Sequence, residues 1–356
     1  MTTPANLPLG PRVLELDYDR EIERVCARLK EILSRGLSRR GLVVAMSGGI
    51  DSSVSAALSV RALGAERVYG LLLPERDSSG GSVTRGRMLA EHLGIRYELF
   101  DIAPTLEAIG CYRWRDEAIR QVFPEYGDGW KNKIVISGGL EGRVNHFQLV
   151  VQTPAGETRQ ARLGLKEYLQ IVAATNFKQR TRKMLEYYHA DRLNYAVAGT
   201  PNRLEYDQGF FVKLGDGAAD VKPIAGLYKT QVYDLARHLG VTDEILERPP
   251  TTDTYSMAQS QEEFFFSLSC DKLDLCLYGR DHGIPAQKVG ATLGLNSWPA
   301  QALVTAALQG TGKDLFDALS VYARTTGKYA EAVYHYNTSV LELKNVVGMS
   351  LSSMNQ

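Results

Sequence analysis

The sequence of 356 residues lacks the features that mark several classes of protein. Four cysteines without a C-x-x-C pair are too few for a disulfide scaffold, so a reducing compartment is expected. The 41 basic and 41 acidic residues give a formal net charge of zero, which favours neither nucleic acid nor an anionic membrane as a partner. No apolar run reaches the length of a membrane span, and the N-terminus has no basic-then-apolar signal pattern. We therefore expect a cytoplasmic protein with no membrane partner and no nucleic-acid partner.

The sequence does contain a glycine- and serine-rich turn between a predicted strand and a predicted helix. The apolar residues 41–46 fit a buried strand, and apolar residues recur at helical spacing after position 53. The turn Ser-Gly-Gly-Ile-Asp-Ser-Ser, residues 47–53, therefore lies at a helix N-terminus, where free N–H groups and the helix dipole favour an anion. Gly48 and Gly49 have no Cβ atoms, so a phosphate can approach the backbone. The turn predicts a phosphate site with hydroxyl donors from Ser47, Ser52 and Ser53.

Asp51 is the unexpected member of this turn, because a carboxylate repels phosphates unless a cation lies between them. A Mg²⁺ ion that bridges Asp51 and the phosphates resolves the conflict. A bare Ser-Gly-Gly is typical of an ordinary helix-capping turn, whereas the whole string between a strand and a helix favours phosphate binding. It is not a Walker A loop, because the Lys-Ser/Thr pair at the required spacing is absent.

The first third of the chain alternates strands and helices. We expect strands at residues 67–73 and 95–102, a helix at 85–93, and a polar, glycine-rich loop at 74–82. This alternation predicts an α/β fold, a doubly wound parallel sheet with helices on both faces, and ligands bind at the carboxyl ends of the strands in such sheets.

Residues 110–166 interrupt this pattern and are predicted to be β-rich. Residues 147–152 and 158–163 flank a Thr-Pro-Ala-Gly-Glu turn and indicate a β-hairpin, and 131–137 are a further candidate strand. Two interpretations stay open for this insertion: a surface excursion, or a substrate lid or oligomer contact.

Helical periodicity returns at residues 168–190 and is followed by a strand at 193–198 and a helix from Lys229 to residue 239. We expect mostly helix over 271–337 and a frayed tail at 350–356. The predicted organisation is a nucleotide-binding domain at 14–285, interrupted by the insertion, and a C-terminal helical region at 286–356.

Several motifs carry a resemblance to a known group of enzymes. The loop SGGIDSS resembles the pyrophosphate-binding loop of the N-type ATP pyrophosphatases. The downstream strings are similar to those of the ammonia-dependent NAD synthetases and read GTPNRLE, GFFVKLGDGAADVKPIAGLYKTQVYDLARHLG and ERPPTTD. The resemblance spans residues 20–278 apart from the insertion. It implies an adenine nucleotide alpha hydrolase-like fold in which ATP adenylates the carboxylate of deamido-NAD, pyrophosphate leaves, and ammonia displaces AMP.

The resemblance also implies roles for individual residues. Asp51 and Glu205 would hold Mg²⁺, and Lys229 would stabilise the charge that develops on the pyrophosphate. Asp51, Lys229 and Asp216 are the candidate catalytic residues. A separate hypothesis, which does not rest on the resemblance, is that a carboxylate near Asp216 or Asp220 orients ammonium and takes its proton. ATP would contact Ser47, Gly48, Gly49, Asp51, Ser52, Ser53, Thr200, Lys229 and Thr251, and deamido-NAD would contact Arg180, Lys213 and Asp220.

Three departures from the family all lie on the side that would hold deamido-NAD. The helix motif with Arg180 begins with Thr175 rather than glutamate, the usual C-terminal His-Lys-Arg cluster is missing, and the insertion is long. A ligase that amidates another carboxylate, or less favourably a tRNA-modifying enzyme on the same loop, therefore stays an alternative, and a non-catalytic nucleotide-binding module is a third. No nitrilase-like domain precedes residue 14, which predicts free ammonia or a separate partner as the nitrogen source, and the resemblance implies a homodimer.

Overall fold

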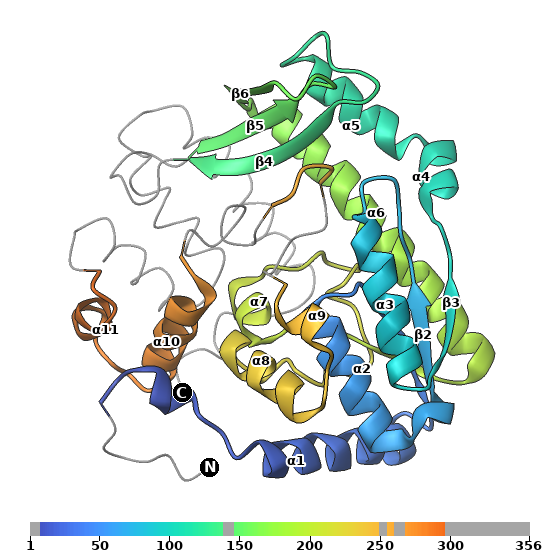
Figure 1. Cartoon of the computed structure of the whole chain (residues 1–356), viewed down its shortest axis with the longest axis vertical. Coiled ribbons are helices and arrows are strands. Elements are labelled where there is room, and N and C mark those ends of the chain that lie inside the picture. The colour runs from blue at the N-terminus through green and yellow to red at the C-terminus, as the bar shows by residue number, and fades with distance from the viewer. Residues whose placement is uncertain (1–7, 138–145, 249–254, 260–267, 296–356) are drawn as a thin grey trace, which may run out of the picture.

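A four-stranded parallel sheet forms the centre of the protein. The computed structural model describes residues 8–137, 146–248, 255–259 and 268–295. The strand order is β3-β2-β1-β7, with β1 at Leu42–Ala45, β2 at Val68–Leu72, β3 at Arg96–Leu99 and β7 at Ala196–Ala198. Leu42 pairs with Val68 on one side and with Ala196 on the other, so β1 is a central strand. Figure 1 labels its neighbour β2 and the edge strand β3.

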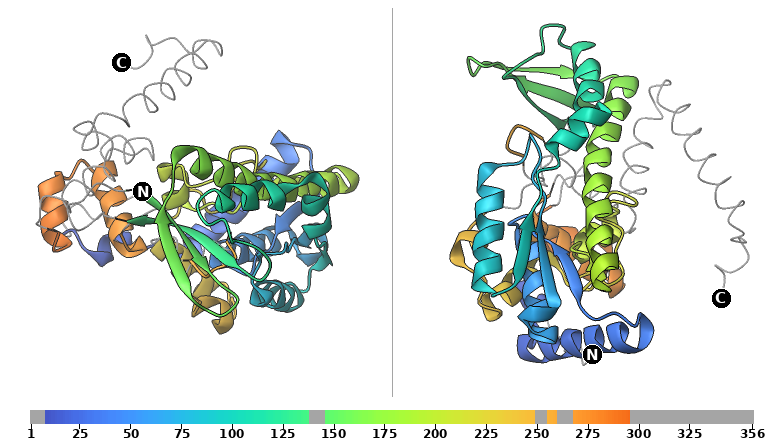
Figure 2. Two further views of the ribbon diagram at one scale, coloured as in Figure 1. Left: turned by 90° about the horizontal axis from the view of Figure 1, so that it is seen from above. Right: turned by 90° about the vertical axis from the view of Figure 1, so that its right-hand side faces the viewer.

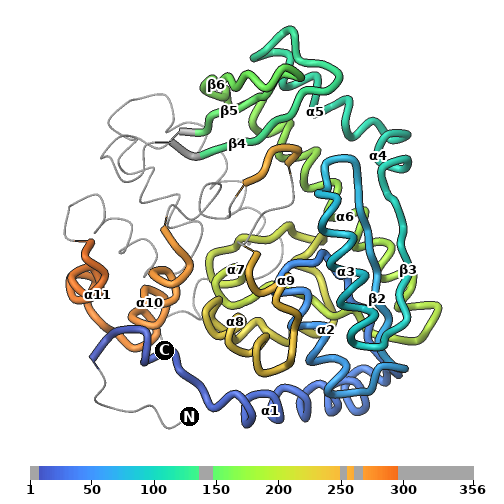
Figure 3. The backbone as a smooth tube through the Cα atoms, in the orientation of Figure 1, coloured from blue at the N-terminus to red at the C-terminus, as the bar shows by residue number. Residues whose placement is uncertain are grey.

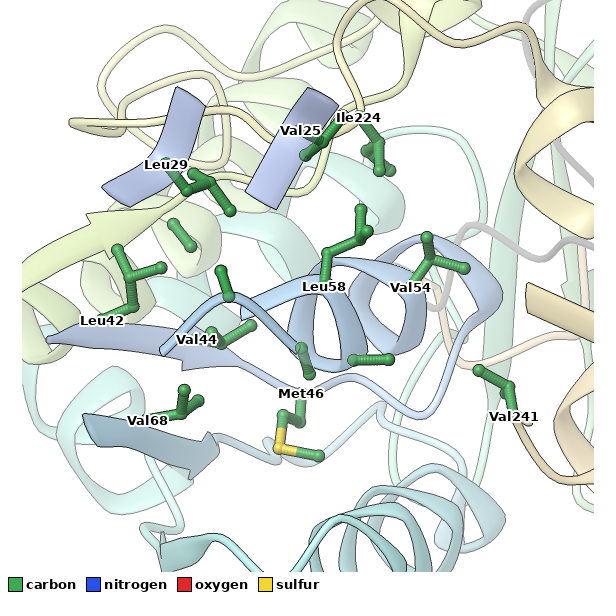
Figure 4. Packing of buried hydrophobic residues seen from close by; sticks show 14 of the residues in the cluster. Val25, Leu29, Leu42, Val44, Met46, Val54, Leu58, Val68, Ile224 and Val241 are labelled. Atoms are coloured by element: carbon green, nitrogen blue, oxygen red, sulfur yellow. The ribbon is translucent and has the colours of Figure 1, made fainter. Parts of the chain in front are cut away.

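Helices cover both faces of this sheet, as the alternation predicts. Leu42 and Val44 point to the face that carries α1 (Tyr18–Glu31), α2 (Ile50–Leu63), α3 (Gly80–His92) and α8 (Lys229–His238), as Figure 4 shows for the packing around Leu58. Val43 points to the opposite face, which carries α4 (Ala103–Ile109), α5 (Cys111–Arg120) and α6 (Leu165–Leu193). The strands lie between α3 and α6 in the right-hand view of Figure 2. Continuous apolar strands that are buried on both faces are expected for a parallel sheet.

The insertion forms a second, antiparallel sheet, and it begins with helix α5 rather than with a strand. Its order is β4-β5-β6, with β4 at Lys131–Ser137, β5 at His146–Gln152 and β6 at Thr158–Arg162. The predicted strand and hairpin are therefore confirmed. Ile134 and Leu149 pack in one cluster with Ile171 of α6, so the inserted sheet is attached to that helix.

Several boundaries differ from the predicted ones for local reasons. Helix α3 begins at Gly80, because Ser82 N donates to Ser79 O and closes the first turn there. Helix α6 extends to Leu193 and ends at Asn194, which adopts a left-handed conformation, so β7 starts only at Ala196. Strand β3 is shorter than the predicted 95–102.

Short elements and two helices complete the described chain. Helices α10 (Cys270–Asp281) and α11 (Ala286–Thr292) pack with Leu14 and Tyr228 in one apolar cluster, which confirms helix within the first part of 271–337. The rest of that range, from residue 296, and the tail lie outside the described residues. The bounds of the remaining elements are η1 Pro11–Leu14, a π-helical turn η2 Ile32–Gly36, η3 Ala65–Arg67, α7 Arg203–Gln208, α9 Asp243–Leu246, α10 Cys270–Asp281 and α11 Ala286–Thr292.

Among the residues that the structure describes, no helix combines the length and the apolar composition needed to cross a bilayer.

Candidate active site

A cavity of about 420 Å³ opens at the carboxyl ends of β1, β2 and β7. Its wall comes from the turn after β1, the loop after β2, one face of α6 and the starts of α7 and α8. This is the edge of a doubly wound sheet at which ligands bind. The sequence-predicted residues that line it are Ser47, Gly49, Asp51, Ser52, Thr200, Glu205, Asp216 and Lys229.

The glycine-rich turn is shaped by close packing against the loop after β2. Gly48 has φ = 72°, and a Cβ atom there would lie 2.6 Å from the carbonyl oxygen of Ser82, so a larger residue would clash. The hydroxyls of Ser52 and Ser53 donate to Gly49 O at 2.9 and 2.8 Å. Ser53 is fully buried and does not line the cavity, so its geometry is that of a helix-stabilising side chain.

Asp51 is held between a lysine and an amide at the start of α2. The Nζ atom of Lys229 lies 2.5 Å from one carboxylate oxygen, and Asn202 Nδ2 donates to the other at 2.9 Å. Burial alone would lower the pKa of Lys229, but the carboxylates of Asp51 and Glu205 outweigh burial and raise it. Lys229 therefore stays a cation although only 1% of its surface is exposed.

Glu205 lies in the first turn of helix α7, shortly after the end of β7. Its backbone N–H donates to Asn202 Oδ1, and its carboxylate accepts from Asn202 N, each at 3.1 Å, which is a capping box. Burial and the nearby charge of Asp51 raise the pKa of Glu205 to about 8. Two carboxyl groups are thus held close enough to repel each other.

The residues present suit Mg²⁺. The repulsion between Asp51 and Glu205 is the arrangement that a divalent cation relieves. Over the described ranges no group of three or more potential ligands comes together. Mg²⁺ is usually bound through one or two carboxylates and completes its shell with phosphate and water.

Helix α8 presents Lys229 because a buried carboxylate caps its start. Asp274 of α10 accepts from the backbone N–H groups of Lys229 at 3.1 Å and Thr230 at 2.7 Å. Asp274 is fully buried, so it fixes the first turn of α8 against α10. The sequence shows a lysine at a helix start, where the dipole opposes a cation. The structure adds the carboxylates of Asp274 and Asp51 that offset this opposition.

A second group of charges lies on the wall formed by α6. Lys183 Nζ donates to Glu186 at 2.7 Å, and both side chains are buried. Asp216 accepts from Val212 N at 2.7 Å and faces the same cavity. Burial raises the pKa of both Glu186 and Asp216, so each carboxyl group holds a proton more readily than in water.

The three residues predicted to contact deamido-NAD do not line the cavity. Arg180 Nε donates to the carbonyl oxygen of Lys213 at 3.0 Å, and the Lys213 side chain is exposed. Asp220 accepts from Val197 N, in the middle of β7, at 2.8 Å. Their roles toward substrate stay predictions, and Thr251 lies outside the described residues.

The inner face of α6 is the part of the site that the sequence analysis missed. Polar residues at helical spacing within the predicted helix 168–190 were a signal for a polar face, but the sequence alone does not say which face meets the cavity. From this helix the lining residues are Tyr168, Val172, Thr175, Asn176, Gln179, Arg182, Lys183 and Glu186.

Known proteins share the sequence and the fold of this chain. The family model described as NAD synthase matches residues 21–122 and 147–309 and passes over 123–146, the stretch that contains β4. An NH(3)-dependent NAD(+) synthetase of Mesorhizobium japonicum is 60% identical over 284 residues, covering 80% of this chain and 89% of that protein. A synthetase of the same name from Rhizobium meliloti is 59% identical over 283 residues, covering 79% and 84%. The solved NH3-dependent NAD synthetase from Campylobacter jejuni shares the fold, with a TM-score of 0.54, 23% identity and coverage of 85% and 96%. The chain therefore belongs to the NAD synthase family.

Proposed function

We propose that this chain is an ATP-dependent ligase that converts deamido-NAD to NAD with ammonia. The observation that carries the proposal is the meeting of Asp51, Glu205 and Lys229 in one cavity at the start of α2. A binding module for nucleotides does not need two carboxylates and a buried lysine at the phosphate site. A magnesium-assisted phosphoryl or nucleotidyl transfer does need them.

The first half-reaction requires position and charge and no enzyme nucleophile. A carboxylate oxygen of the substrate attacks the α-phosphorus of ATP, the bond to the bridging oxygen breaks, and pyrophosphate leaves with the electron pair. We assign the glycine-rich turn to the pyrophosphate, because its N–H groups lie at the start of α2. Lys229 then faces the negative charge that builds up on the leaving group. Mg²⁺ bound at Asp51 and Glu205 would neutralise phosphate charge.

The second half-reaction joins ammonia to the activated acid. Ammonium loses one proton to become the nucleophile and a second as the C–N bond becomes an amide, while the C–O bond to AMP breaks. We assign the first of these protons to Asp216, because its carboxyl group faces the cavity and burial favours its protonated form.

Replacement of Asp216 with asparagine is expected to lower kcat by about 10²-fold at saturating ammonium, the usual contribution of a general base. Asp191→Asn, which changes an exposed carboxylate of helix α6, is the control and should leave kcat unchanged. Full turnover of Asp216→Asn at saturating ammonium would remove Asp216 from the reaction.

We also propose that two copies pair through the outer face of α6. Leu169, Met184 and Tyr188 are 54%, 73% and 60% exposed, which is unusual for large apolar side chains that fall on one broad side of a helix. The double variant Met184→Glu/Tyr188→Glu is expected to shift the mass measured by light scattering from twice 39.4 kDa to 39.4 kDa at micromolar concentration. Leu37→Glu, on a separate surface, should stay a dimer, and a monomeric unmodified protein would contradict the proposal.

The function itself is tested by pyrophosphate release from ATP, Mg²⁺ and ammonium, with and without deamido-NAD. Release that depends on deamido-NAD and forms NAD supports the proposal. Release only with another carboxylate would show that deamido-NAD is not the substrate, and it would still support adenylation of a carboxylate. Absence of release with every carboxylate tested would favour a binding module.

A further inference from the structure

The inserted strand β4 is bonded along its free edge to residues 255–259. Asn132 N donates to Ser256 Oγ at 2.8 Å, and Met257 N donates back to Asn132 O at 3.2 Å. Further along the strand, the side chain of Gln259 donates to the carbonyl oxygen of Ile134. Figure 3 shows this short orange segment beside the inserted sheet. The segment therefore lies along the edge of the sheet, on the side of β4 that β5 leaves unpaired.

The contact is buried and is held at its centre by one asparagine. Asn132 is fully buried, and its Nδ2 atom lies 2.8 Å from the Tyr126 hydroxyl and 3.3 Å from Ser256 Oγ. The side-chain amide of Asn132 thus meets two hydroxyls, while its backbone N–H and carbonyl oxygen bond to Ser256 Oγ and Met257 N. Such a buried polar junction fixes one register, because any slip leaves buried donors unpaired.

The segment begins with a residue of the cavity wall. Tyr255 lines the cavity beside Tyr168 and Val172 of α6, and its hydroxyl lies next to Thr175. The remainder of the ring packs into the cluster that joins the inserted sheet to α6, which includes Ile134 and Ile171. The position of Tyr255 is therefore set on one side by α6 and on the other by β4.

We propose that the inserted sheet holds Tyr255 in the cavity wall, and that Asn132 and Ser256 are positioning residues for the planar substrate that this wall contacts. Tyr168 and Tyr255 give the inserted-sheet end of the cavity an aromatic wall. Flat heteroaromatic rings, as in a dinucleotide, pack well against such a wall. The inference rests on the proposed function for the identity of the substrate. Of the two interpretations of residues 110–166, the proposal takes the one in which the insertion has a part in substrate binding.

The test compares Ser256→Ala with Ser256→Thr in the full-length protein. Ser256→Ala removes the oxygen that accepts from Asn132 N and leaves the strand backbone intact, while Ser256→Thr keeps the hydroxyl. Ser256→Ala is expected to raise the KM for deamido-NAD about tenfold with kcat changed less than twofold, and Ser256→Thr to restore the KM. Faster hydrogen exchange of the Met257 amide in Ser256→Ala would accompany this shift, because the bond to Asn132 is weakened.

Gln160→Ala, on the exposed face of β6, is the matched control within the same sheet and should leave KM and exchange unchanged. An unchanged KM in Ser256→Ala would overturn the inference. A fall in kcat together with faster hydrogen exchange throughout the protein would also overturn it, because this result would indicate general destabilisation. The unmodified protein is assayed first. If it does not act on deamido-NAD, the proposed function is wrong. If it is active and Ser256→Ala leaves the KM unchanged, only the positioning role is wrong.

Discussion

Replacement of Lys229 with methionine is expected to lower kcat for pyrophosphate release by about 10²–10³-fold, the range found when one preorganised charge-stabilising group is removed. Lys229 Nζ is the cation that contacts Asp51 at the proposed phosphate site, and only 1% of the surface of Lys229 is exposed. Its loss removes the charge that faces the leaving pyrophosphate. The measurement is the steady-state rate of deamido-NAD-dependent pyrophosphate release at saturating ATP.

Loss of Lys229 also leaves Asp51 and Glu205 as two partly buried carboxyl groups without their cation, so Lys229→Met should unfold at a lower temperature. Lys229→Arg separates the two effects, because it keeps the charge and the fold but offers a different donor geometry. We expect Lys229→Arg to keep most of the stability and to lose at least tenfold in kcat. Lys30→Met, an exposed lysine of α1, is the control. A kcat of Lys229→Met within threefold of the unmodified protein would exclude a role in the transition state.

Replacement of Lys178 with methionine is expected to lower the free energy of unfolding by about 3–5 kcal/mol, the cost of breaking a buried ion pair on one side. Lys178 Nζ lies 3.1 Å from Glu75 and 2.5 Å from Asp77, and all three side chains are buried. Arg115 also pairs with Asp77. Burial would raise the pKa of Asp77, but Lys178 and Arg115 outweigh it and lower that pKa. These ion pairs hold Glu75 and Asp77 of the loop after β2 against Arg115 of α5 and Lys178 of α6.

Chemical denaturation measures this effect, and Arg113→Ala is its control. Arg113 forms an exposed pair with Glu117 at 3.8 Å on α5, and such surface pairs contribute about 0–1 kcal/mol. The same loop brings Ser78 into the cavity wall, so Lys178→Met should also raise the KM for ATP. Equal stability of the Lys178 and Arg113 variants would show that the buried pairs do not hold the loop.

The glycine-rich turn could be predicted from the sequence because all of its parts are contiguous. A strand, a turn and a helix N-terminus fix where the N–H groups and Asp51 point, and the structure has this arrangement. The β-hairpin of the insertion was predictable for the same reason, since alternation and a turn are local properties. Such features depend on neighbours in the chain.

The remaining parts of the site depend on distant contacts. The capping box of Glu205 with Asn202 is local, but the approach of both residues to Asp51 depends on β1 and β7 being neighbours in the sheet. The Lys183–Glu186 pair faces the cavity only because α6 packs on the sheet with that side. The hydrogen bond between Ser256 and Asn132 joins segments far apart in the chain, so no local sequence pattern predicts it.

The most direct test of adenylation is the fate of oxygen in the substrate carboxylate. Deamido-NAD labelled with ¹⁸O in its carboxylate is incubated with the protein, ATP, Mg²⁺ and ammonium, and the AMP and NAD are analysed by mass spectrometry. Attack of the carboxylate on the α-phosphorus transfers one ¹⁸O atom into AMP and leaves the other in the amide of NAD. AMP without the label, or label found in pyrophosphate, would contradict adenylation of the substrate carboxylate in this cavity.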